Sequence, residues 1–112
     1  GINIINMLDV KVYTNQFKRS GYLLAKKSLA DFTKMAALEY APNCRINGIA
    51  IGWLLDPNGN IRDGKTAKKY LDKIPLNIKV DPSDLLTSID FILGNKQITG
   101  QIINLAGGSD LK

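Results

Sequence analysis

Ile2-Asn-Ile-Ile-Asn-Met-Leu8 and Arg45-Ile-Asn-Gly-Ile-Ala-Ile51 are two short apolar runs, separated by a long segment of helical pattern. Short apolar runs that are rich in β-branched residues and bounded by turn signals are typical of buried strands. A third run of this kind covers residues 99–105 and leads into the glycine turn Ala106-Gly-Gly108. The three runs predict three strands.

The segment after the first run predicts a long helix over roughly residues 20–40. Proline cannot continue a helix, so Ala41-Pro42-Asn43 marks its end. One face of this helix should carry an apolar stripe that packs on the strands. We expect the stripe to consist of Leu24, Leu29, Phe32, Met35, Ala36 and Leu38.

Two further helices are expected before the last strand. Residues 65–73 can form a short basic helix. Asp81 is a favourable N-cap residue, with Pro82 at the first helical position, so a helix should run from there to about residue 93. Residues 9–19 and 53–62 are polar or turn-rich and are expected to be irregular.

The order of elements is therefore strand, helix, strand, helix, strand. This alternation favours an α/β fold with parallel strands joined by right-handed crossovers. Ligands bind to such sheets beyond the carboxyl ends of the strands. Asp9, Gly52 and Gly107 each lie just past a predicted strand, so we expect them on one rim.

Composition excludes several classes of function. The chain has 112 residues, which allows one domain, and it contains no histidine, which excludes a His-based triad or zinc site. Its one cysteine, Cys44, cannot form an internal disulfide and is expected to be structural. No apolar run is long enough to span a membrane and no signal peptide is visible, so we expect a cytoplasmic protein without a membrane partner.

The net charge is +5, from 15 basic and 10 acidic residues. The basic residues are scattered and lack interleaved aromatic residues, so nucleic-acid binding is not expected. Solvated helix faces explain such charges, although some of them could attract an anionic cofactor.

Tyr22 and Lys26 lie four residues apart in Gly21-Tyr-Leu-Leu-Ala-Lys-Lys-Ser-Leu-Ala30. On a helix this spacing places both side chains on one face, about one turn apart. A phenol can give a proton, and a neighbouring ammonium lowers the cost of forming phenolate. The pair is a candidate acid–base site if a substrate reaches it, and otherwise part of a solvated helix face.

The chain as a whole resembles the C-terminal half of a short-chain dehydrogenase/reductase. The resemblance rests on the order and spacing of five pieces over essentially all 112 residues. They are Ile4-Ile-Asn-Met7, Tyr22-x-x-x-Lys26, Ala41-Pro42-x-x-Arg45-Ile-Asn-Gly48, Ile98-Thr-Gly-Gln101 and Gly107-Gly108. It implies half of a Rossmann-like, doubly wound parallel sheet.

Within that family the chain is most similar to pteridine reductases. Asp9 follows Ile4-Ile-Asn-Met-Leu8, thirteen residues before Tyr22, at a position where most members carry serine and pteridine reductases carry aspartate. A carboxylate there can accept hydrogen bonds from a pterin ring and relay a proton to it. The alternative is that Asp9 caps nearby backbone N–H groups in the loop.

The resemblance also implies roles for other residues. Tyr22 would donate or relay the proton, and Lys26 would lower the pKa of Tyr22 and bind the nicotinamide ribose. Asn6 would shape the end of the strand. Ile51 and Gly52 would flank the nicotinamide, with Ile51 in place of the family's usual proline. Trp53 would line the substrate pocket or else pack in the loop.

The dinucleotide-binding half of the family is not found in these 112 residues, since no G-x-x-x-G-x-G follows any predicted strand. That half normally cradles the cofactor phosphates at a helix N-terminus. We therefore expect residues 1–112 to be the catalytic half of one domain, needing an N-terminal half as partner. The family also implies a homo-oligomer, commonly a tetramer, that buries the helix at residues 20–40.

The leading hypothesis is an NADP(H)-dependent oxidoreductase that reduces a small-molecule pterin, folate or carbonyl substrate, with NAD(H) not excluded as cofactor. The competing hypothesis is an inactive or split-gene fragment that serves only as an oligomerising or interaction module. A glycine-rich strand–turn–helix encoded upstream would favour the enzyme.

Overall fold

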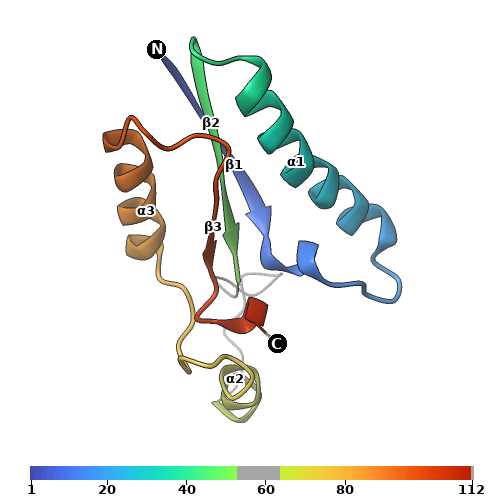
Figure 1. Cartoon of the computed structure of the whole chain (residues 1–112). Coiled ribbons are helices and arrows are strands. Elements are labelled where there is room, and N and C mark those ends of the chain that lie inside the picture. Colours follow the sequence, from blue (N-terminus) through green and yellow to red (C-terminus); the bar gives the residue numbers. More distant parts are fainter. Residues whose placement is uncertain (53–63, 112) are drawn as a thin grey trace.

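The computed structural model describes residues 1–52 and 64–111, which form an α/β fold around a parallel sheet of three strands (Figure 1). The sheet has the order β1 (Ile2–Asp9), β2 (Cys44–Ile51) and β3 (Ile102–Leu105). Asp9 pairs with Ile51, and Ile51 pairs with Leu105, so all three strands end at the same level. The expected rim at their carboxyl ends is confirmed.

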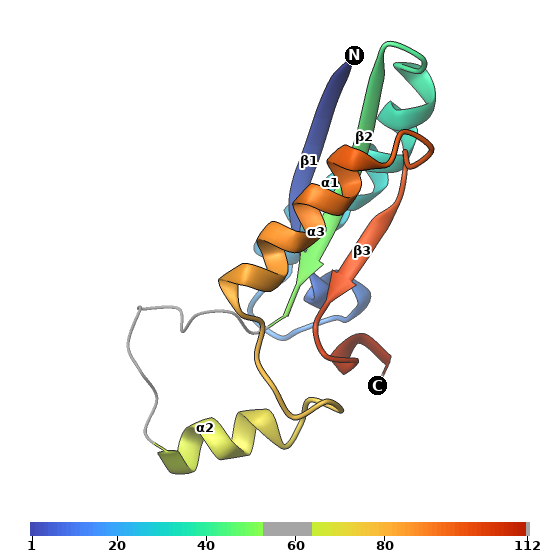
Figure 2. The same ribbon diagram turned by 90° about the vertical axis from the view of Figure 1, so that its left-hand side faces the viewer.

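The two long helices cover opposite faces of the sheet. α1 (Ser20–Glu39) packs on one face and α3 (Pro82–Gly94) lies over the other (Figures 1 and 2). α2 (Gly64–Leu71) lies beyond the carboxyl ends of the strands, away from both layers. This is the doubly wound arrangement that the sequence predicts.

The face of α1 that packs on the sheet differs from the expected one. Leu24, Phe32, Met35 and Leu38 are 50–84% exposed, so the expected apolar stripe was wrong for these four residues; Ala36 is buried, and Leu29 packs against the core. The other side chains that face the sheet are mostly small. They are Leu23, Ala30, Thr33 and Ala37. Small side chains let the helix approach the strands closely, and this requirement outweighs the size of the apolar residues.

Two irregular connections also depart from expectation. The segment after β1 contains a 3-10 turn, η1 (Val10–Tyr13), and Val10 is only 5% exposed. β3 begins at Ile102 rather than at residue 99, because the chain bends at Gly100 before it enters the strand. Gly100 has φ +70°, and its N–H donates to the Ile46 carbonyl at 2.7 Å.

Both ends of α3 are fixed by side chains. Asp81 forms a capping box with Asp84 at the N-terminus, as predicted for the cap. At the C-terminus, the guanidinium of Arg45 reaches over from β2. It donates to the carbonyls of Ile92, Leu93, Asn95 and Ile98 at 2.8–3.1 Å. Two of these carbonyls, those of Ile92 and Leu93, belong to the last turn of the helix, which leaves them unpaired.

Candidate functional site

Three predicted site residues meet where β1 ends and α1 begins. Asp9 is the last residue of β1, and Tyr22 and Lys26 lie in the first two turns of α1. The Tyr22 hydroxyl donates to Asp9 Oδ2 at 2.8 Å, and Lys26 Nζ donates to the Met7 carbonyl at 3.0 Å. The predicted juxtaposition of Asp9, Tyr22 and Lys26 is therefore present in the fold.

Asp9 both caps the backbone of the loop and contacts Tyr22, the two roles that its sequence position suggested. Its Oδ1 accepts a hydrogen bond from the Lys11 backbone N–H at 2.8 Å and so caps η1. Its Oδ2 accepts the bond from Tyr22. The cap fixes the carboxylate, and the fixed carboxylate orients the phenol. The capping and functional interpretations of Asp9 are thus compatible.

The pKa of the Tyr22 phenol is raised above its ordinary value. Burial contributes most, followed by the hydrogen bond to Asp9 and the negative charge of that carboxylate, whereas the charge of Arg19 acts in the opposite direction. The guanidinium of Arg19 also lies over the Tyr22 ring, 4.6 Å from its centroid. The expected lowering by Lys26 is not among the causes of this shift; the Lys26 ammonium donates to the Met7 carbonyl. Tyr22 is consequently held as a protonated phenol.

A buried polar contact holds α1 against β1. Asn6 Nδ2 donates to Thr33 Oγ1 at 2.9 Å, and that hydroxyl donates to the Leu29 carbonyl at 2.7 Å. Thr33 is fully buried. The role expected for Asn6 was at the strand end; its contact instead fixes the middle of α1, which keeps Tyr22 and Lys26 beside the strand. Sequence reasoning missed Thr33, since a single threonine in a helix gives no signal.

Ile51 and Gly52 lie at the end of β2, next to the segment after β3. The Gly52 N–H donates to the Leu105 carbonyl at 2.8 Å. A Cβ at residue 52 would lie 2.9 Å from the Ala106 Cβ, so only glycine fits here without a shift. Trp53, the remaining predicted site residue, lies outside the described residues.

A second polar network braces the rim and was not predicted. The Tyr13 hydroxyl donates to Asn104 Oδ1 at 2.9 Å, and Asn104 Nδ2 donates to Asp110 Oδ2 at 3.0 Å. The network joins η1 to β3 and to the segment that follows β3. Its first bond links two residues that are 91 positions apart in the chain. No local motif marks such a contact, so only the fold reveals it.

A hollow of about 470 Å³ opens beside the carboxyl end of β3. Its walls come from three segments: residues 76–80, residues 84–88 of α3, and residues 104–108. Asp9, Tyr22 and Lys26 do not line it. Within residues 1–52 and 64–111, no three His, Cys, Asp or Glu side chains gather in a way that could hold a metal ion. None of the described helices is long and apolar enough to cross a membrane.

A family model described as enoyl-(acyl carrier protein) reductase matches residues 2–110. It represents short-chain dehydrogenases/reductases, and the chain belongs to this family. The family assignment from the sequence is confirmed, and with it the Rossmann-like fold.

Similar proteins include reductases of several substrates. The 3-oxoacyl-[acyl-carrier-protein] reductase FabG of Aquifex aeolicus is 29% identical, over 94% of this chain and 44% of its own length. Dihydromonapterin reductase of Klebsiella pneumoniae is 26% identical, over 98% of this chain and 45% of its own. The chain thus spans less than half the length of these relatives.

Among solved structures, FolM alternative dihydrofolate reductase 1 of Brucella canis, complexed with NADP, superposes with a TM-score of 0.84. It is 29% identical, and the match covers 98% of this chain and 42% of that one.

Proposed function

We propose that this chain is the catalytic half of an NADP(H)-dependent reductase whose substrate is a pterin or folate-like compound. The hydrogen bond from Tyr22 to Asp9, beside Lys26 at the carboxyl end of β1, is the observation that carries the proposal. It supplies a protonated donor, a fixed carboxylate and a cation at the edge where parallel sheets bind ligands.

The residues at this edge fit a nicotinamide nucleotide. An ammonium has three N–H donors, so the bond from Lys26 to Met7 leaves donors for ribose hydroxyls. Ile51 and Gly52, at the end of the neighbouring strand, would flank the nicotinamide ring. FolM of Brucella canis, which is similar over 98% of this chain, was solved with NADP. When bound, a dihydronicotinamide supplies a hydride.

The chain's own residues would supply the proton. Tyr22 is held as a phenol by its raised pKa, so at neutral pH it retains the proton that reduction consumes. Asp9 accepts the Tyr22 hydroxyl bond and fixes its direction. A pterin ring presents N–H groups, and a carboxylate is the matching acceptor for them.

A carbonyl substrate is the second candidate. FabG of Aquifex aeolicus, a 3-oxoacyl reductase, is similar to this chain at 29% identity. Asp9 favours the pterin, because a carbonyl oxygen needs a donor and an ionised carboxylate offers only acceptors. The relative rates on a dihydropterin and on a 3-oxoacyl thioester distinguish the two.

The proposal includes an N-terminal half that completes the sheet and the cofactor site, within a cytoplasmic homo-oligomer. β1 is at the edge of the sheet formed by the described residues, and Ile2 and Ile4 are 63% and 42% exposed there. An apolar edge strand of this kind is normally covered by another strand. We call the chain together with this N-terminal half the assembled enzyme.

A binding titration tests this proposal. NADPH fluorescence is followed as either the chain alone or the assembled enzyme is added. Saturable binding by the assembled enzyme, and much weaker binding by the chain alone, is expected. No binding by the assembled enzyme would favour the alternative of an interaction module without catalysis.

A further inference from the structure

The proton transfer proposed for Tyr22 creates an unfavourable charge beside Asp9. When the phenol gives its proton to the substrate, the O–H bond breaks and the bonding pair stays on the phenol oxygen, which becomes a phenolate. The Tyr22 oxygen lies 2.8 Å from Asp9 Oδ2, so the new negative charge forms next to an existing one. Two like charges at this distance repel each other, and a cation close to the phenolate is needed to offset the repulsion.

Arg19 is the cation of the described residues that acts on Tyr22. Its guanidinium lies over the Tyr22 ring, 4.6 Å from the centroid, and its charge opposes the rise in the pKa of that phenol. Lys26, which the resemblance suggested for this role, donates to the Met7 carbonyl instead. The charged groups that act on Tyr22 are therefore Asp9, from the end of β1, and Arg19, from the turn before α1.

The charge of Arg19 is not used elsewhere in the fold. The guanidinium makes one hydrogen bond, to the Gln16 side chain at 3.3 Å. In residues 1–52 and 64–111 no carboxylate pairs with it. Arg19 is exposed at the rim, so its positive charge acts on the Tyr22 ring and on the solvent in front of it.

The position of Arg19 does not favour helix formation. Arg19 is the N-cap of α1, where Ser, Thr, Asp and Asn are preferred, and its side chain makes no capping hydrogen bond. A cation there faces the positive end of the helix dipole, and the first turn of α1 holds no acidic residue to offset it. Local choices that oppose the fold are expected at functional sites. The contact with Tyr22 therefore explains this arginine better than helix capping does.

We propose that Arg19 assists the proton transfer through Tyr22, because its guanidinium stabilises the phenolate that forms beside Asp9. The inference rests on the proposed reductase function and adds a residue to it. Arg19 acts through Tyr22, so it is a positioning residue rather than a catalytic one. In this arrangement the Lys26 ammonium remains available for the ribose hydroxyls of the cofactor.

Arg19→Gln in the assembled enzyme tests this role through kinetics. Removing one charge at this distance should lower kcat with a dihydropterin about threefold to tenfold at low salt, and leave the KM for NADPH within about twofold. Without the cation the pKa of Tyr22 rises further, so the alkaline limb of the kcat profile should move to higher pH. Arg19→Lys keeps the charge and should restore most of kcat and the position of this limb.

A spectroscopic titration follows the ionisation of Tyr22 without turnover. The near-ultraviolet absorbance of phenolate is measured against pH, and the difference from the matching protein with Tyr22→Phe isolates this residue. The midpoint in Arg19→Gln should lie about 0.5–1 pH unit above that of the unmodified assembled enzyme. Arg19→Gln should melt at the same or a higher temperature, because it removes a cation from the helix N-terminus, so the loss of kcat is not a loss of fold.

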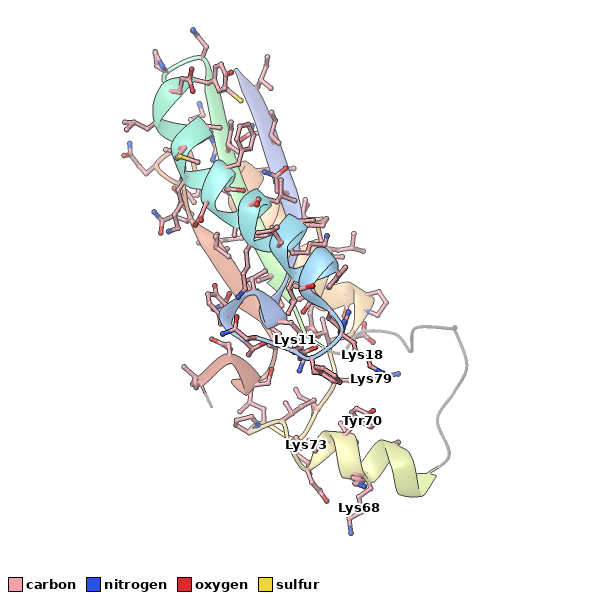
Figure 3. The ribbon with its side chains drawn as sticks, turned by 90° about the vertical axis from the view of Figure 1, so that its right-hand side faces the viewer. Lys11, Lys18, Lys68, Tyr70, Lys73 and Lys79 are labelled. Carbon is pink, nitrogen blue, oxygen red and sulfur yellow. The ribbon has the colours of Figure 1, made fainter. Side chains whose placement is uncertain are left out.

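Lys18→Gln is the matched control. Lys18 is the neighbouring cation in the same loop, exposed at the carboxyl-terminal end of the sheet (Figure 3). It lies over the Phe17 ring, 5.5 Å from the centroid, and is not among the groups that shift the pKa of Tyr22. Lys18→Gln should therefore leave kcat within about twofold and the titration of Tyr22 in place. Equal losses of kcat in Lys18→Gln and Arg19→Gln would show a general effect of surface charge and overturn the inference.

The remaining outcomes separate the inference from the function on which it rests. Unchanged kcat and an unchanged titration in Arg19→Gln would overturn the inference and leave the reductase function standing. Equal losses of kcat in Arg19→Gln and Arg19→Lys, with the titration unchanged, would assign Arg19 only to packing on the ring and overturn it as well. No reduction of a dihydropterin by the unmodified assembled enzyme would remove the reductase function and the inference together.

Discussion

At the scale of single residues, the carboxylate of Asp9 organises the candidate site. It is the N-cap of η1 and the acceptor of the Tyr22 hydroxyl at once. Because one side chain makes both contacts, the backbone after β1 and the direction of the phenol are set together. A proton donor that is already held in place loses little conformational entropy when substrate binds.

Removing the hydroxyl of Tyr22 tests its assigned role. Tyr22→Phe in the assembled enzyme should lower kcat by about 10²–10⁴-fold, the usual contribution of a general acid, with little change in fold. Steady-state kinetics measure the loss, and circular dichroism checks the fold. Tyr40→Phe, at the exposed C-cap of α1, is the matched control and should keep full activity. An unchanged rate in Tyr22→Phe would remove this residue from the mechanism.

The pH profile follows from the raised pKa of Tyr22. Reduction needs the protonated phenol, so the rate should stay level through neutral pH and fall only as pH rises past the ordinary tyrosine pKa of about 10. Asp9→Asn removes the negative charge and the carboxylate acceptor that raise this pKa, so the alkaline limb should move to lower pH. An alkaline limb that stays in place, or moves upward, would contradict the assigned pair.

At the scale of elements, the fold positions the site through long-range polar contacts. Asn6 and Thr33 join β1 to α1, and Arg45 joins β2 to the C-terminus of α3. Tyr13, Asn104 and Asp110 join η1 to the segment after β3.

The hydrogen bonds from Arg45 to carbonyls at the C-terminus of α3 give a prediction about stability. Arg45→Lys loses the planar fork that donates to four carbonyls and should lower the free energy of unfolding of the assembled enzyme by about 1.5–3 kcal/mol. Urea unfolding measures the change. Arg19→Lys is the control. The Arg19 guanidinium makes one hydrogen bond to the Gln16 side chain, at 3.3 Å, and lies over the exposed Tyr22 ring, where a lysine keeps the charge, so the effect should stay within about 0.5 kcal/mol. An equal change in the free energy of unfolding in the two variants would show that the Arg45 hydrogen bonds do not stabilise α3.

The sequence predicted those features of the fold and site that depend on interactions between residues close together in the chain. Strand runs, the Asp81 cap and the four-residue spacing of Tyr22 and Lys26 are all visible within a few residues. The buried face of α1 was predicted correctly at Leu29 and Ala36. It was wrong for the larger exposed residues because apolarity was weighed above size, whereas the sheet also selects Ala30 and Ala37 for close approach. The Tyr13–Asn104 bond spans 91 residues and leaves no local pattern.

At the scale of the whole molecule, large apolar surfaces remain on the described chain. The outer face of α1 exposes Leu24, Phe32, Met35 and Leu38, and the edge of β1 exposes Ile2 and Ile4. Contiguous apolar surfaces of this kind mark protein–protein contacts. They agree with the proposed N-terminal half along β1 and the proposed oligomer through α1.

Sedimentation tests this proposal. The isolated 112-residue chain should self-associate or melt without cooperativity, and the N-terminal half should convert it into a discrete species. Met35→Glu/Leu38→Glu places charges on the outer face of α1 and should shift the assembled enzyme toward smaller species. A monomeric, cooperatively melting chain would mean that residues 1–112 are self-sufficient, and the proposal of a half-domain would have to be withdrawn.

The central claim is that Asp9, Tyr22 and Lys26 form the catalytic centre of a reductase, and NADPH oxidation tests it most directly. The loss of NADPH absorbance is followed for the assembled enzyme with dihydrofolate or dihydrobiopterin, beside the chain alone and the assembled Tyr22→Phe variant. The account predicts that the assembled enzyme consumes one NADPH per dihydropterin reduced, while the chain alone and the variant show roughly a hundredth of that rate or less. Oxidation at the same rate in the Tyr22→Phe variant, or none by the assembled enzyme, would contradict it.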